Sequence, residues 1–118
     1  MEDRSTYITI GSKEYELVFT TYATKQVSKK YGDLRKLGDA LETKALEESL
    51  DDIVWLVTLL ANQGIMRHNM YNHTNEPLLK EEEVEILTSP GDYIDYNKAI
   101  QEAIVKGTKR FVTSEEKN

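Results

Sequence analysis

The sequence contains no cysteine, and this absence excludes several kinds of site. Without a thiol, the chain forms no disulfide and has no cysteine nucleophile, cysteine-ligated zinc or iron–sulfur cluster. The six glycines are scattered, and none belongs to a phosphate-binding loop. No serine stands in a nucleophile-elbow setting. We therefore expect no catalytic motif, no metal site and no cofactor, and we predict that the protein is not an enzyme.

Basic residues are fewer than acidic ones, with 15 Lys and Arg against 21 Asp and Glu, so the net charge is -6. A protein that follows a phosphate backbone needs a basic face, so we expect no nucleic-acid partner. The longest apolar run is far shorter than the roughly 18 residues that a membrane-spanning helix requires. The opening MEDRSTYITI has no apolar signal core. We expect one cytoplasmic domain, residues 1–118, with no membrane partner.

Residues 7–19 predict an antiparallel β-hairpin. Tyr7 to Ile10 alternates and is rich in β-branched residues, Gly11 to Glu14 supplies a turn, and Tyr15 to Phe19 is again strand-like. An isolated hairpin is marginally stable in water, so one of its faces must pack on helices. The residues expected to be buried are Ile8, Ile10, Leu17 and Phe19.

Two short helices are expected after the hairpin. Thr20 or Thr21 can cap the first helix, and Gly32 stands where a helix commonly ends. A second helix is expected from Asp33 onward, with Leu34, Leu37 and Leu41 on one side. Both helices then need an apolar partner, and the next segment provides it.

The segment LDDIVWLVTLLANQGI, residues 50–65, is the most apolar part of the chain. Its large apolar residues follow helical spacing and extend nearly all round the helix, so neighbours must surround it. We predict the central helix of the core here, with Trp55 and Leu56 largely buried and part of the surface available to a partner.

The rest of the chain predicts alternating helices and breaks. Residues 67–77 are typical of a helix end that runs into a loop, and residues 80–87 predict a short acidic helix. Thr88 to Gly91 breaks this helix before a last helix over 92–107, with Tyr93 and Tyr96 in its first turn. A flexible tail is expected over 112–118. The fold class is α+β: a hairpin packed on four or five helices, with the helical part over 21–107.

Two groups of polar residues have alternative interpretations. His68 and His73 are five residues apart, a spacing that does not place two metal ligands on one helix face. Glu81, Glu82 and Glu83 can favour a helix start through the helix dipole. They can also supply acid–base chemistry, and a small hydrolase that uses Glu81, Glu83 and His73 remains an alternative.

Aromatic and apolar side chains beside polar residues are the candidates for a partner-binding surface. Tyrosine and tryptophan are enriched at protein interfaces, because an apolar ring and a polar tip suit a partly wet contact. The candidate residues are Tyr22, Trp55, Leu59, Tyr71, Tyr93 and Tyr96.

The order of these features resembles a known family. YITIGSKEYELVFTTYATKQVSKKYGDL is similar to the opening of tail assembly chaperones of long-tailed, siphovirus-type phages and prophages. The resemblance continues through the central helix, the EEEVEIL helix, the Pro-Gly break and the final AIQEAIVKG segment, over about residues 7–107. The polar segment from Met66 to Leu79 has no counterpart in that pattern.

The resemblance implies a role in assembly. Such chaperones bind the tape measure protein in the host cytoplasm, help to recruit tail tube subunits and are absent from the finished virion. We expect these partners, together with weak self-association, through apolar and aromatic surface. Another phage-type interaction module, such as a head–tail connector or a small prophage regulator, is the alternative.

The resemblance also implies a longer product made by ribosomal frameshifting near the end of the gene. Glu116-Lys117-Asn118 can be encoded GAA AAA AAC, which contains the slippery heptamer A AAA AAC. The codons of the gene decide this expectation.

Overall fold

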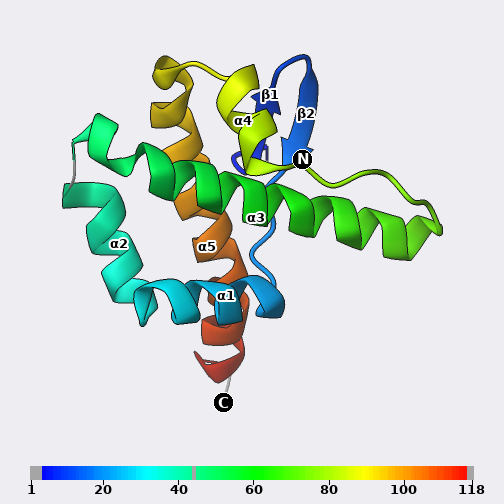
Figure 1. The fold of residues 1–118 in the computed structure, drawn as a ribbon. Helices are drawn as coiled ribbons and strands as arrows, with labels where there is room; N and C mark the ends of the chain where they lie inside the picture. Colours follow the sequence, from blue (N-terminus) through cyan, green and yellow to red (C-terminus); the bar gives the residue numbers. More distant parts are fainter. Residues whose placement is uncertain (1–3, 44, 117–118) are drawn as a thin grey trace.

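The computed structural model describes residues 4–43 and 45–116 of the chain. A two-stranded hairpin is followed by five α-helices, which confirms the predicted α+β fold (Figure 1). The elements are β1 (Tyr7–Ile10), β2 (Lys13–Glu16), α1 (Thr21–Tyr31), α2 (Leu34–Thr43), α3 (Leu46–Asn72), α4 (Glu81–Leu87), the short 3-10 helix η1 (Pro90–Asp92) and α5 (Tyr93–Glu116).

The hairpin pairs Tyr7 with Glu16 and Ile10 with Lys13, which leaves a two-residue turn. Gly11 begins that turn at a φ of 65°, a conformation that glycine adopts without steric cost. All four residues expected to be buried in this region are buried.

The second strand begins and ends earlier than predicted, because Lys13 and Glu14, which the sequence predicts in the turn, pair with β1. It ends at Glu16, although the sequence predicts strand as far as Phe19. The physical reason is a change of partner, because the Val18 N–H donates to the carbonyl of Leu60 in α3 at 3.2 Å. The chain therefore leaves the sheet and runs against the central helix.

Local capping signals fix α1 at both predicted ends. The Thr20 hydroxyl accepts a hydrogen bond from the Ala23 N–H at 3.1 Å, and Gly32 adopts a φ of 99° after the last turn. At the start of α2, an Asp33 carboxylate oxygen accepts from the Lys36 N–H at 2.8 Å. This bond to the charged form lowers the pKa of Asp33.

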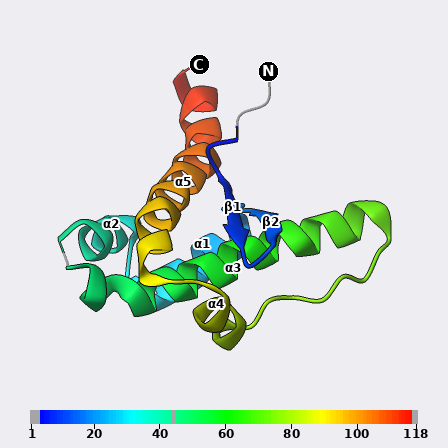
Figure 2. The ribbon, with the colours of Figure 1, turned by 90° about the horizontal axis from the view of Figure 1, so that it is seen from above.

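The 27-residue helix α3 forms the centre of the fold. It contacts β2 and the other four α-helices, and α5 crosses behind it (Figures 1 and 2). Its inward residues Ile53, Leu56, Val57 and Leu60 are fully buried. The part of α3 that crosses the body of the domain is therefore surrounded by other elements, as its apolar sequence predicts.

The last helix is longer than the sequence predicts. It continues through Gly107 to Glu116, so the predicted end at Gly107 is wrong. Gly107 instead allows close packing, because a Cβ atom there would lie 2.8 Å from the Phe19 carbonyl oxygen. The backbone of the predicted tail is helical up to Glu116, and its flexibility stays a prediction. Lys117 and Asn118, on which the frameshift expectation partly rests, lie outside the described residues.

Candidate interaction surface

The C-terminal turns of α3 project beyond the body of the domain (Figures 1 and 2). The helix ends at Asn72, where His73 follows with a φ of 54°, and the chain then runs back alongside the helix toward α4. The sequence predicts this helix end and loop. It does not predict that the loop is attached to the helix.

Two asparagine side chains attach the returning loop to α3. Asn62 donates to the Leu79 carbonyl at 2.9 Å and accepts from the Leu79 N–H at 2.7 Å. Two turns further on, the Asn69 side chain donates to the Glu76 carbonyl at 3.1 Å and accepts from the Glu76 N–H at 3.0 Å. An amide carries both a donor and an acceptor, so each side chain pairs with backbone as a neighbouring strand would. The polar segment from Met66 to Leu79 is therefore a braced extension of the fold.

Glu76 links this extension to the hairpin. Its carboxylate lies 3.1 Å from His68 Nε2 and 3.7 Å from Lys13 Nζ. About half of each side chain is exposed, and such pairs contribute little to stability. These contacts place His68 beside the loop, which the two asparagines hold. Among the described residues, no group of three or more His, Cys, Asp or Glu side chains is arranged to hold a metal ion.

The extension carries the most exposed large apolar side chains of α3. Met70 is 71% exposed and Tyr71 is 78% exposed, and Met66 lies one turn before Met70 on the same side. The start of α1 adjoins this turn, because the Thr20 hydroxyl donates to Gln63 Oε1 at 2.5 Å. Gln63 in turn contacts the sulfur of Met66 at 3.8 Å.

These contacts bring the start of α1 close to Gln63 and Met66 of α3. We use the name α1–α3 corner for the exposed residues near this junction and on the turns of α3 beyond it: Tyr22, Lys25, Met66, Met70 and Tyr71. Tyr22 and Tyr71 are predicted surface residues that the structure leaves exposed. The candidates predicted from the sequence are mainly tyrosine and tryptophan, so Met66 and Met70 are not among them. Methionine is nevertheless a common residue of adaptable binding surfaces.

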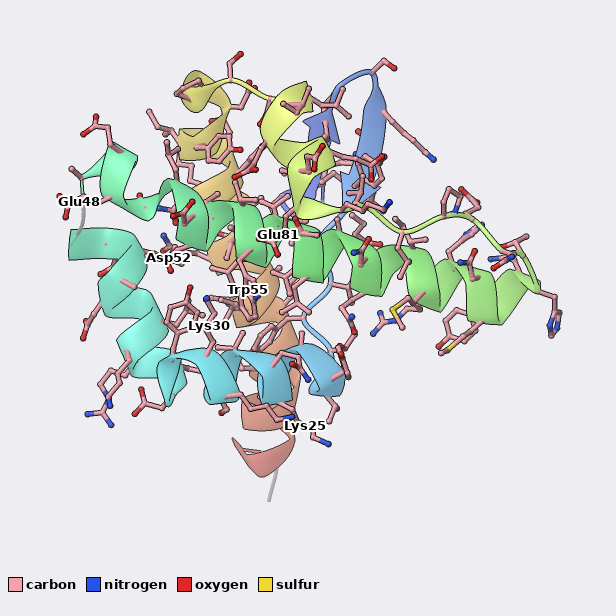
Figure 3. The ribbon with its side chains drawn as sticks, viewed as in Figure 1. Lys25, Lys30, Glu48, Asp52, Trp55 and Glu81 are labelled. Carbon is pink, nitrogen blue, oxygen red and sulfur yellow. The ribbon has the colours of Figure 1, made fainter. Side chains whose placement is uncertain are left out.

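Trp55 and Leu59 lie half-buried on the side of α3 that continues into the corner. The Trp55 ring meets Tyr31 edge to face at 6.0 Å and lies 5.0 Å from Lys30 Nζ, as Figure 3 shows between α3 and α1. The Tyr31 hydroxyl donates to Asp52 at 2.5 Å, and burial together with this carboxylate raises the pKa of Tyr31. The predicted burial is complete for Leu56 and partial for Trp55.

Tyr93 and Tyr96 lie in the core, where each is only 4% exposed, and they need correction as surface candidates. Their hydroxyl groups find partners inside the fold. Tyr96 donates to the Thr9 carbonyl at 2.5 Å, and the Tyr93 hydroxyl lies 2.9 Å from the Thr88 hydroxyl. Because the polar tips are satisfied, both rings can be buried. The candidate surface therefore consists of the corner with Trp55 and Leu59.

The corner is also free of acidic residues. The segments 17–32 and 53–75 contain no Asp or Glu, in a chain that carries 21 of them. The same segments contain Lys25, Lys29, Lys30 and Arg67. Figure 3 shows that Lys25 points away from α3 at the outer side of α1. The charged residues of these two segments are therefore all basic, in a chain whose net charge is -6.

The structure does not bring together the residues of the hydrolase alternative. His73 lies at the tip of the extension, whereas Glu81 follows Leu79, which is bound to Asn62. Ten residues of helix separate Asn62 from His73 at the tip, a length of about 15 Å. Glu83 accepts from the Lys80 N–H at 2.8 Å and so caps α4. The Glu83 carboxylate therefore has a structural role at a helix start.

Comparisons with known proteins add no relative to this description. A scan of protein-family models, a search of curated proteins and a search of solved structures each returned no match. Within the described ranges, none of the helices combines the length and the apolar character needed to cross a membrane.

Proposed function

We propose that this protein is an assembly chaperone of the phage tail type, which binds the tape measure protein and helps to recruit tail tube subunits in the host cytoplasm. It works by binding, without a chemical step. Two things support the proposal: the resemblance in the order and spacing of sequence features, and the α1–α3 corner.

The corner is the observation that carries the proposal. Met70 and Tyr71 are large exposed apolar side chains on a helix end that is held by two asparagines, and exposed apolar residues that gather on a rigid element are typical of a protein-binding site. Methionine side chains are flexible and polarizable, so they can adapt to helices of different sequence. An apolar helix laid across such a surface is a recurring mode of peptide recognition.

The test is co-expression of the tagged chain with the tape measure and tail tube proteins encoded beside its gene, followed by affinity capture. We expect the tape measure protein to be retained by the wild type and lost with Met70→Asp or Tyr71→Asp. Both side chains are exposed, so these substitutions disturb the fold little.

Ile94→Asp is the matched control, because Ile94 is an exposed apolar residue on α5, outside the corner. Capture that survives the corner substitutions, or that is equally lost with the control, would count against the proposed surface. No capture of either protein by the folded wild type would count against the function itself.

A further inference from the structure

A small cavity lies where the chain passes between α3 and α5 after β2. Residues 17–20 join β2 to α1 (Figure 1). They approach α3, where the Val18 N–H donates to the Leu60 carbonyl. They also approach α5, where a Cβ atom at Gly107 would lie 2.8 Å from the Phe19 carbonyl oxygen. The cavity beside this segment has a volume of about 220 Å³. Pockets that enclose a drug-sized ligand have roughly 300–1,000 Å³, so this cavity has room for a smaller molecule.

Two basic side chains, one from each helix, line the cavity. Arg67 follows Gly64 by three residues, so the two lie on the same side of α3. That side meets the segment after β2, because a Cβ atom at Gly64 would lie 3.7 Å from Val18 Cγ2. Lys106 belongs to α5, and its Nζ lies 3.5 Å from Thr6 Oγ1. Within the described ranges, Arg67 forms no ion pair.

The Thr6 hydroxyl supplies a third donor at the cavity wall. Thr6 is only 1% exposed, and its oxygen accepts a hydrogen bond from Lys106. In the part of the chain that the structure describes, no protein group accepts the hydroxyl proton. Since buried hydroxyl groups can donate as well as accept, an acceptor bound in the cavity completes the hydrogen bonds of Thr6.

The charge of the lining selects the kind of acceptor. Glu16 also lines the cavity, so two cations face one carboxylate there. This balance favours a ligand with one negative charge over a phosphate dianion, because Glu16 repels the second charge. The remaining lining residues offer apolar side chains and backbone, which suit a short aliphatic chain; they are Leu17, Val18, Phe19, Ala103 and Gly107.

We propose that this cavity binds the anion of a small aliphatic carboxylic acid. The carboxylate lies between Arg67 and Lys106 and accepts the Thr6 proton, while the aliphatic part lies against Val18 and Ala103. The planar fork of a guanidinium group matches the two oxygen atoms of a carboxylate. A bound acid joins α3, α5 and the segment after β2, so it also stabilises the folded chain. None of the lining residues belongs to the α1–α3 corner.

The test is a titration of the ¹⁵N-labelled full chain with sodium butyrate, followed by NMR. We expect saturable shifts of the amide signals of Val18, Ala103 and Gly107, together with a rise in Tm. Sodium chloride and butyramide are the matched controls, because the first reproduces the ionic strength and the second has nearly the same shape without the charge. Neither control should give a saturable shift.

Two variants each remove one cation from the cavity. Arg67→Gln and Lys106→Gln should each weaken the binding of butyrate at least about tenfold, the effect of losing one charge-assisted hydrogen bond. Arg35→Gln is the control variant, because it removes the same charge from an exposed position on α2 that does not line the cavity. It should bind butyrate as the wild type does.

Inorganic phosphate tests the role of Glu16. At about pH 8, where phosphate is a dianion, it should bind the wild type more weakly than butyrate does. Glu16→Gln should strengthen the binding of phosphate about threefold or more, because it removes the repelling carboxylate.

Four results would overturn the proposal. They are no saturable shift with butyrate in the folded wild type, equal binding of butyramide and butyrate, an unchanged affinity in both Arg67→Gln and Lys106→Gln, and tighter binding of phosphate than of butyrate to the wild type. Circular dichroism shows that each variant is folded before it is compared. The measurement uses this protein alone, so its outcome is independent of the proposed binding of a tape measure protein.

Discussion

Gly64 provides the most direct test of how the hairpin is joined to the central helix. A Cβ atom at this position would lie 2.6 Å from the carbonyl oxygen of Glu16, a backbone atom that cannot rotate away. The hydrogen bond from the Val18 N–H to the Leu60 carbonyl also holds the segment after β2 close to α3. Gly64→Ala must therefore push β2 and α3 apart.

The magnitude follows from two opposing effects. Overpacking of this kind costs up to about 3 kcal/mol, and replacing a helical glycine with alanine returns up to about 1 kcal/mol. We expect a net loss of about 2 kcal/mol in the free energy of unfolding, or roughly 8 °C in Tm for a chain of this size. Urea and thermal unfolding, followed by circular dichroism at the helical band, measure both quantities.

Gly38 is the matched control, since it lies inside α2 and a methyl group added there would have no neighbouring atom within 4 Å. Gly38→Ala should stabilise the protein by about 0.5–1 kcal/mol through helix propensity alone. A Gly64→Ala protein as stable as the Gly38→Ala protein would refute the close approach and the reasoning built on it.

Other consequences of the structure can be measured separately. Val57→Asp should unfold the protein, because an unpaired buried charge costs several kcal/mol, whereas Val105→Asp at an exposed position should leave the circular dichroism spectrum unchanged. Burial raises the pKa of Tyr96 to about 12, above its unfolded value, so its contribution to stability is complete below about pH 10 and is lost as the pH rises toward 12. Tyr96→Phe should flatten the fall in unfolding free energy over that range, and an unchanged slope would contradict the assignment. Asn69→Ala should speed hydrogen exchange in the loop after α3, whereas Asn72→Ala, which removes bonds only to His68 of the same helix, should not.

Features set by neighbouring residues could be predicted from the sequence. Thr20 and Gly32 cap α1 through bonds that span three or four residues, and the apolar spacing around Val57 places it in the core. Gly11 lies in the hairpin turn as the sequence predicts, although the turn has two residues and the prediction extends it to Glu14. Each of these features depends on residues that are close together in the sequence, so the sequence alone is enough to predict it.

Features that depend on distant partners could not be predicted. Tyr96 can be buried because the backbone carbonyl of Thr9, 87 residues away, accepts a hydrogen bond from its hydroxyl group. The second strand ends early because the Val18 N–H donates to the Leu60 carbonyl in α3 and not to the neighbouring strand. Gly107 has the sequence signal of a helix end, yet the structure uses it for contact with Phe19. In each case, tertiary packing decides between two local alternatives.

The candidate surface also contains residues that the sequence predicts and residues that it does not. All four tyrosines stand beside polar residues in the sequence, so the same pattern predicts each of them at the surface. In the structure Tyr22 and Tyr71 are exposed, whereas Tyr93 and Tyr96 are buried. Met70 is a candidate only because α3 projects beyond the domain, which the sequence does not reveal. The bracing by asparagines likewise depends on where the loop returns.

The central claim is that the α1–α3 corner binds the tape measure protein. Calorimetric titration of a purified tape measure fragment into the wild type, Met70→Asp and Ile94→Asp tests it most directly. We predict saturable binding to the wild type and to Ile94→Asp, and binding at least about tenfold weaker to Met70→Asp, as expected for an exposed apolar contact residue. Equal affinity for all three proteins, or no heat of binding with the folded wild type, would contradict the claim.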